Sequence, residues 1–465
     1  MLFNSFEFIV FFLVVLGSYY ALPHRLRWPL LLLASCFFYM YFIPEYILIL
    51  LCTILITYGS GILMERTDKR NYRKNILIVS MMLNVFILAY FKYFTFLHDN
   101  LTAVLGLVSA ENRLPLMQIM LPVGLSFFVF QSISYSIEVY RGTLDAERHL
   151  GFYALYVMYF PQLVAGPIER PQNIIPQLKK DAKFSLGNLE AGLKLILLGL
   201  FKKVVVADQL SLYVDNVYGT ELYQSPEQIF AAAMLFSFQI YCDFSGYSDM
   251  AIGLARAMGI KLMINFRQPY FSYSLTNFWQ RWHISLSSWF KDYLYIPLGG
   301  NRGSKYNTYR NILIIFAVSG LWHGASWTFV LWGLIHGFIV ALERFTNYNP
   351  RRKGYFCSFV GGLTTFFIVT FAWIFFRAVD VNQAFHFVSL LPSISAEQTL
   401  MLFSHPAMLY NICLVCLLIF IDFYFTRITV DKFSTVVKTI FYTLIALFII
   451  IMGSFNSSSF IYFQF

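Results

Sequence analysis

Long apolar segments recur along the whole chain and are separated by short polar stretches. Most are about 17 to 25 residues long, the length at which an α-helix crosses roughly 30 Å of hydrocarbon. The pattern therefore predicts an all-α, polytopic membrane protein with about eleven transmembrane helices plus re-entrant or interfacial segments. The expected helices span residues 6–20, 28–42, 45–64, 75–97, 117–140, 188–206, 228–242, 311–343, 355–376, 408–426 and 436–453.

Two regions depart from this pattern. Residues 152–164 are apolar but too short for one pass, and Gly166-Pro167 follows them, so we expect a re-entrant or buried segment. Residues 244–301 are too polar to face lipid, and irregular backbone at membrane depth is tolerated only where protein buries it or water reaches it. We therefore expect a single integral-membrane domain over residues 1–465, with a functional core at 160–345.

The composition supports this class of protein. Hydrophobic residues make up 58% of the chain and charged residues 12%, against roughly 45–50% and 25% in soluble globular domains. This balance excludes large soluble domains, disordered chains and collagen-like chains. The six cysteines lie in or beside apolar segments, and the pair Cys413 and Cys416 has no second pair to complete a zinc site. We expect neither a disulfide framework nor a bound metal.

The formal charge of +10 is interpreted as a sign of membrane topology. Basic residues gather in short loops such as 65–74 and 351–353, as expected for cytoplasmic loops under the positive-inside rule. Arg25 and Arg27 follow the first apolar segment, which favours an external N-terminus and a retained first helix. Nucleic-acid binding is excluded because the sequence has no soluble basic module with aromatic platforms.

Several common active sites are also excluded. The sequence has no glycine-rich dinucleotide motif, no phosphate-binding loop, no zinc-protease motif and no serine-hydrolase elbow. Ionisable residues inside membrane segments are costly and are by default candidates for function. Two histidines meet this description, His283 and His323.

His283 lies in a polar stripe. A continuous helix over 276–291 would place Thr276, Gln280, His283, Ser287 and Lys291 on one face, which would then meet water or polar groups. The alternative is an interfacial helix whose tryptophans lie among the headgroups and whose histidine is incidental.

His323 lies inside an otherwise apolar segment. Ser319 and Ser326 fall on the same helical face, and Gly324 would leave room for a substrate. The alternative is a core histidine that forms a hydrogen bond with a neighbouring helix. His336 should lie on another face of a straight helix unless the glycines break that helix, and a packing or pore-lining role is expected at least as much as a catalytic one. An imidazole with a pKa near 6.5 suits acyl transfer, because it can accept a proton from a hydroxyl and return one to a thiolate.

Longer motifs carry a family resemblance. They are Val164–Arg170, Cys242–Gly253, Asn265–Tyr270, Phe278–His283, Gly320–Ala325 and Phe371–Ala378. In this order and over nearly the full length, the chain resembles the membrane-bound O-acyltransferases, and within them the branch that acetylates bacterial alginate. The resemblance implies a thin central partition, reached by a tunnel from the cytoplasm and by a funnel from the other face.

The resemblance also implies roles for individual residues. His323 matches the family's catalytic histidine, as general base or transient acyl carrier. His283 matches the second polar position and would position the thioester or the acceptor. Further residues are expected to bind substrate or line the tunnel: Gln280, Arg281, Ser287, Trp322, Ser326 and Asp249.

The implied reaction moves an acetyl group from cytoplasmic acetyl-CoA toward hydroxyls of an extracytoplasmic polysaccharide. It would use a periplasmic partner protein, would take place in the bacterial inner membrane, and would need acetyl-CoA as co-substrate but no further cofactor. Residues 298–303 resemble the polysaccharide-acetylating branch more than the branch that passes D-alanine from a carrier protein to teichoic acid.

Two rival functions remain at this stage. A transporter or flippase of an acylated or lipid-linked species would also contain broken helices, although we find no inverted repeat and no chain of carboxylates for a proton relay. An acyltransferase that esterifies sterols or glycerol would share the histidine chemistry. It would require a lateral entrance from the lipid.

Overall fold

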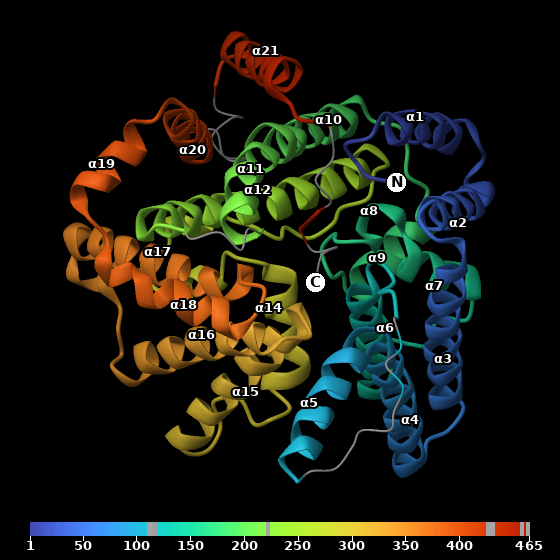
Figure 1. The fold of residues 1–465 in the computed structure, drawn as a ribbon. Coiled ribbons are helices and arrows are strands. Elements are labelled where there is room, and N and C mark those ends of the chain that lie inside the picture. Colours follow the sequence, from blue (N-terminus) through green and yellow to red (C-terminus); the bar gives the residue numbers. More distant parts are fainter. Residues whose placement is uncertain are drawn as a thin grey trace. The chain divides into compact units, whose positions relative to one another are not determined.

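A computed structural model describes residues 1–108, 115, 117, 119–219, 224–424, 433–455 and 460–461. The regular structure of this part of the chain is entirely helical (Figure 1). It folds into two compact units. Unit 1 comprises Met1–Leu193 and Ala251–Met263, and unit 2 comprises Lys194–Met250 and Ile264–Phe465.

Unit 1 is built on three mutually packed helices, α3 (Ile47–Glu65), α4 (Arg70–Leu88) and α6 (Leu125–Arg141) (Figure 1). The helix α2 (His24–Met40) packs against α1 (Phe6–Ala21) and α7 (Leu150–Met158). The remaining elements are η1 (Pro44–Tyr46), η2 (Ala89–Tyr93), α5 (Phe94–Leu107), α8 (Phe160–Leu163), α9 (Pro171–Lys179) and the first part of α10 (Leu186–Leu200).

The short apolar segment 152–164 lies inside unit 1, as the sequence predicts. It forms two short helices, α7 and α8, with a break between them at Tyr159. Every residue from Tyr153 to Leu163 is buried. Because α7 has only 9 residues, it could not have crossed a bilayer in one pass.

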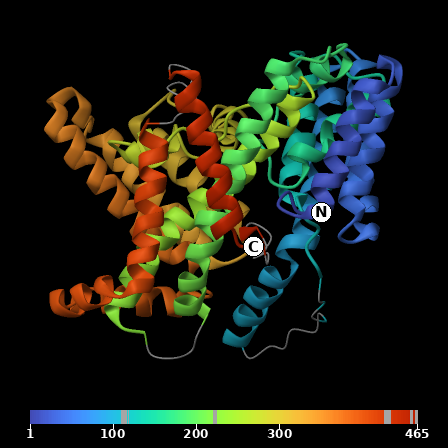
Figure 2. The same ribbon diagram turned by 90° about the horizontal axis from the view of Figure 1, so that it is seen from above.

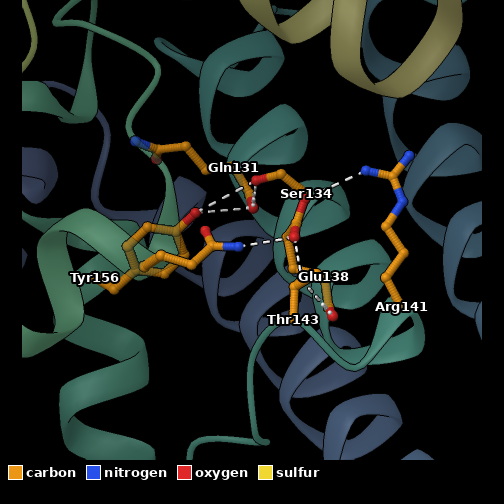
Figure 3. A network of polar contacts seen from close by, with 7 residues as sticks. Gln131, Ser134, Glu138, Arg141, Thr143 and Tyr156 are labelled. Atoms are coloured by element: carbon orange, nitrogen blue, oxygen red, sulfur yellow. Dashed lines mark hydrogen bonds and ion pairs between the residues drawn. The ribbon is translucent and has the colours of Figure 1, made fainter. Parts of the chain in front are cut away.

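A polar network ties α6 to its neighbours in unit 1 (Figure 3). The buried carboxylate of Glu138 contacts three polar side chains, those of Arg141, Thr143 and Gln172. The hydroxyl of Tyr156 on α7 donates to the backbone carbonyl of Gln131 at 3.1 Å. Polar residues embedded in the apolar α6 therefore serve helix packing, since buried polar groups need partners.

Unit 2 contains the longest helix, α12 (Pro226–Ala257), whose last turns belong to unit 1. Two short helices follow, α13 (Leu275–Trp279) and α14 (Ile284–Phe290). The hairpin of α15 (Lys305–His323) and α16 (Trp327–Phe345) packs through α16 against α17 (Tyr355–Arg377).

The other elements of unit 2 are η3 (Phe201–Ala207), α11 (Asp208–Gly219), η4 (Pro269–Phe271), η5 (Lys291–Tyr295), η6 (Pro350–Lys353), α18 (Val381–Leu390), η7 (Leu391–Ser393) and α19 (Ala396–Ser404). The helices α20 (Pro406–Tyr424) and α21 (Thr435–Met452) run alongside each other (Figure 2). Side chains from both line an apolar groove.

The structure confirms a helical protein with several membrane-spanning segments. By length and hydropathy, seven helices of the described residues could cross a bilayer. The expected number of eleven is not reproduced by these criteria. One reason is that α1, with 16 residues, is apolar but shorter than they require.

Several predicted helix boundaries are wrong, and three of them bear on how the units are built. The helix expected at 117 begins only at Leu125, because Pro122 and the left-handed Gly124, with φ of 76°, precede it. The helix expected to end at 242 continues to Ala257. The segment 311–343 is two helices, because α15 ends at His323 and the side chain of Ser326 caps the N-terminus of α16.

Buried ion pairs explain why α12 continues through its acidic residues. In unit 2, the Lys203 ammonium lies 2.6 Å from Asp243 and 2.8 Å from Asp208, and all three side chains are buried. Lys202 pairs with Asp249 at 3.0 Å. Acidic residues along the apolar α12 are therefore held in ion pairs, as charged groups inside membrane segments generally require.

The Lys203 cluster provides a test of this packing. Lys203→Met should lower the free energy of unfolding by about 3–5 kcal/mol, because it leaves two buried carboxylates without their cation. Lys305→Met, which changes an exposed lysine of the same unit, is the matched control. Thermal unfolding in detergent measures both. Equal unfolding temperatures for the two variants would contradict a structural role for the cluster.

Close packing of α15 against α16 depends on glycine. A Cβ atom on Gly320 would lie 2.1 Å from the carbonyl oxygen of Phe329, and one on Gly333 would lie 2.1 Å from that of Phe316. A Cβ on Gly324 would lie 2.0 Å from the Phe329 ring. The expectation that Gly324 leaves room for substrate is therefore wrong, because the Phe329 ring occupies that space.

Gly320→Ala should destabilise the protein by roughly 1–3 kcal/mol, because the backbone of α16 would have to move away. Gly362→Ala on α17 is the matched control, since its nearest neighbour would lie at 3.7 Å. The control should be neutral or slightly stabilising, because alanine favours helix over glycine. Unfolding temperature and membrane abundance report the difference. A Gly320→Ala protein as stable as the control would refute the close approach.

Candidate functional site

The fold brings the two candidate histidines together in unit 2. His323 is the last residue of α15, and His283 immediately precedes α14. Their ring centroids lie 6.3 Å apart, and the residues are 2% and 0% exposed. Both rings are therefore available to one enclosed site.

A local distortion of the backbone positions His283. Residues 276–291 do not form one helix, because α13 ends at Trp279 and α14 begins at Ile284. His283 between them has a φ of 43°, a left-handed conformation that is uncommon for residues other than glycine. The expected polar stripe along a continuous helix is therefore wrong. Backbone strain of this kind often lies at functional sites.

Two backbone hydrogen bonds hold this distortion in place. The Arg267 amide donates to the carbonyl of Arg281, and the Ile284 amide donates to the carbonyl of Asn265, both at 2.9 Å. Segment 265–267 is thereby joined to segment 281–284. The structure fixes the orientation of His283 through this pairing.

The side chain of Asn265 reaches the same point. Its Oδ1 lies 3.1 Å from Nδ1 of His283 and accepts hydrogen bonds from the backbone amide and hydroxyl of Ser285 at 3.2 and 2.9 Å. Asn265 is fully buried. Our sequence prediction of the site residues missed it, although it opens one of the family motifs.

Aromatic rings surround the two imidazoles. The Trp322 ring lies 6.0 Å from that of His283 and 5.0 Å from that of His323. Two rings from neighbouring helices also lie against His323, those of Trp332 on α16 and Phe376 on α17, at 5.1 and 5.5 Å. Such surroundings exclude water and strengthen the electrostatic interactions inside the site.

His336 has a different environment. Its Nδ1 accepts a hydrogen bond from the indole nitrogen of Trp279 at 3.3 Å, and its ring lies 5.0 Å from that of Trp332. It is fully buried. These contacts fit a packing role. The straight helix from which its direction was expected is wrong, because His323 ends α15 and His336 lies on α16.

The other predicted site residues divide into two groups. Trp322 contacts both histidine rings, and Ser287 lines a pocket. The rest have different surroundings. Ser326 caps α16, and Asp249 forms an ion pair with Lys202. Gln280 is exposed and hydrogen-bonded to Asn277, and Arg281 is half-buried, with its carbonyl accepting a hydrogen bond from the Arg267 amide. The placement of Ser326 on the same helical face as His323 is wrong, because α15 has already ended.

The pocket that contains Ser287 has a volume of about 190 Å³ and belongs entirely to unit 2. Ser319, one turn before His323 on α15, forms part of its wall. The other lining residues are mainly apolar, with one cation: Thr276, Trp279, Leu286, Phe290, Lys291, Tyr295, Ile312, Ile315, Phe316 and Val340. The lining therefore suits a partly apolar molecule that carries a negative group.

Comparison with known proteins identifies the family. The profile of the MBOAT, or membrane-bound O-acyltransferase, family matches residues 147–379. A protein named "Probable alginate O-acetylase AlgI" from Pseudomonas syringae pv. tomato is 39% identical over 83% of this chain and 74% of its own length. The peptidoglycan O-acetyltransferase of Helicobacter pylori is 35% identical over 83% of this chain and 78% of its own length.

A more distant relative is the teichoic acid D-alanyltransferase of Streptococcus thermophilus. It is 32% identical over 53% of this chain and 63% of its own length. Together with the helical fold and the buried histidine pair, the matches show that the chain belongs to the membrane-bound O-acyltransferase family and is a multi-pass membrane acyltransferase.

Proposed function

We propose that this enzyme transfers an acetyl group from cytoplasmic acetyl-CoA toward hydroxyls of an extracytoplasmic polysaccharide, with a periplasmic protein as partner. The membrane would be the bacterial inner membrane. The observation that carries the proposal is the pair of buried imidazoles, 6.3 Å apart within an aromatic enclosure of unit 2.

The relatives favour acetyl as the transferred group. Those named as alginate and peptidoglycan O-acetyltransferases both match over 83% of this chain. The two teichoic acid D-alanyltransferases match over 53% and 50% of it. The relatives favour no single polymer, because alginate and peptidoglycan are different glycans.

His323 is the general base in this proposal. Its imidazole removes the proton of the acceptor hydroxyl as the oxygen attacks the thioester carbonyl. The carbon–sulfur bond then breaks, and the thiolate of CoA takes up the proton from the imidazolium. The products are the acetyl ester and free CoA, and the base is regenerated. Burial protects the thioester from hydrolysis, because water is kept from the reacting carbon.

We assign the pocket of unit 2 to the acyl donor. Ser287 and Ser319 offer hydroxyls along its wall, which could bond the amides of the pantetheine arm. Lys291 offers a cation for a phosphate of CoA. Ser319 lies on the same helix as His323, one turn away, so a donor in this pocket would extend toward the catalytic imidazole.

The experiment uses membranes that contain the wild type or a His323 variant, the periplasmic partner and acetyl-CoA labelled in its acetyl group. His323→Ala and the more conservative His323→Gln should each lower transfer at least about 100-fold, because the proton acceptor is lost. Free CoA and labelled polysaccharide are measured together, with membrane abundance as the folding control. Release of CoA by the variants at the wild-type rate would refute the assignment. If labelled product formed only when a carrier protein loaded with labelled D-alanine replaced acetyl-CoA, acetyl-CoA would be refuted as the donor.

His336→Ala should reduce activity less than His323→Ala, because its contacts are with packing residues. We expect reduced thermal stability and activity within about tenfold of wild type, the lost indole hydrogen bond being worth roughly 1 kcal/mol. The same assay, corrected for the amount of folded protein, gives the comparison. If His336→Ala and His323→Ala were equally inactive at equal abundance, the catalytic histidine would have been assigned wrongly.

A further inference from the structure

The contacts of Asn265 determine its orientation. The backbone amide of Ser285 lies 3.2 Å from one terminal atom of the Asn265 side chain. A backbone amide can only donate, so this atom must be the carbonyl oxygen, Oδ1. The other terminal atom, Nδ2, is correspondingly placed to donate to the hydroxyl of Ser248 at 3.3 Å.

This orientation in turn determines the protonation of His283. Its Nδ1 lies 3.1 Å from the same Oδ1, which is an acceptor. The ring nitrogen must therefore carry the hydrogen, and in the neutral ring Nε2 then carries the lone pair. An imidazole held in this way accepts a hydrogen bond at Nε2 and does not donate one there.

We infer that Asn265 is a positioning residue that holds His283 as the Nδ1–H tautomer, so that His283 binds the hydroxyl-bearing acceptor rather than the thioester carbonyl. This role rests on the proposed acetyl transfer, in which His283 has two candidate partners, the thioester carbonyl and the acceptor. A thioester carbonyl has no hydrogen to donate, whereas a sugar acceptor carries further hydroxyls besides the one that His323 deprotonates, and one of these can donate. Only the acceptor can therefore bond to a lone pair at Nε2.

Burial makes this arrangement rigid. Asn265, His283 and Ser285 are each fully buried. The backbone hydrogen bond from the Ile284 amide to the Asn265 carbonyl fixes the distance between the two segments that carry these side chains. Rotation of the amide would place Nδ2 against the Ser285 amide, setting two donors face to face at a cost of about 1–3 kcal/mol. The tautomer of His283 is therefore set by the fold before substrate binds.

The first test observes the tautomer directly. Nitrogen NMR of ¹⁵N-histidine-labelled protein in membranes distinguishes Nδ1–H from Nε2–H, and subtraction of the His283→Ala spectrum isolates the signal of His283. The wild type should show Nδ1–H, and Asn265→Ala should lose this preference. An Nε2–H signal in the wild type would overturn the inference. This readout does not require turnover, so it stands apart from failure of the proposed function.

The second test uses the rate of CoA release. Asn265→Ala should lower kcat about 10–100-fold, as loss of a positioning contact commonly does, with the KM for acetyl-CoA within about twofold of wild type. The same change in a His283→Ala background should have no further effect, because Asn265 acts through His283. Equal losses in both backgrounds, or a large rise in the KM for acetyl-CoA, would overturn the inference.

Two variants separate positioning from general packing. Asn265→Asp keeps the acceptor but adds a negative charge, which favours the protonated ring. Activity should therefore be lost at a higher pH on the acid side, by roughly one pH unit. Ser237→Ala removes another buried hydrogen bond of unit 2, to Thr370 at 3.0 Å, and should leave the pH profile unchanged. An unshifted acid limb in Asn265→Asp would argue against control of His283.

Discussion

Polar groups buried in a membrane protein depend on partners within the protein, because the hydrocarbon of a membrane offers none. This constraint shapes both units. Glu138 is held by three side chains in unit 1, and Lys203 by two carboxylates in unit 2. The same requirement joins Asn265 to His283. In this last case the partner does more than compensate burial, because it selects which ring nitrogen carries the hydrogen.

The apolar pattern predicted much of the fold. Most long apolar segments became helices, and the short segment 152–164 was correctly expected to be buried. Hydropathy could not reveal the break between α15 and α16, because Gly324 and Ala325 are as compatible with an apolar helix as with its end. Hydropathy also placed the end of α12 too early, because Asp243 and Asp249 lower the hydropathy there. The sequence does not show that Lys203 and Lys202 neutralise these two carboxylates.

The site was predicted in part. His283 and His323 were expected at one place, and the fold brings their rings together. Asn265 was missed because its importance comes from contacts with residues 283 and 285. The sequence pattern placed both of these residues inside one continuous helix, whereas the structure has α13, a break, and then α14. The role of Ser326 was misjudged for a similar reason. A helical face was assumed to continue past His323, where the structure has a cap for the next helix.

In the proposed mechanism, acyl transfer takes place at the histidine pair of unit 2, with the donor in the pocket beside α14 and α15. The most direct measurement is an experimental structure of the enzyme in lipid with a thioether analogue of acetyl-CoA, which cannot transfer its acetyl group. The account predicts that the acetyl end lies beside His323, with the pantetheine arm along Ser287 and Ser319. An analogue bound with its acetyl end away from both His283 and His323 would contradict it.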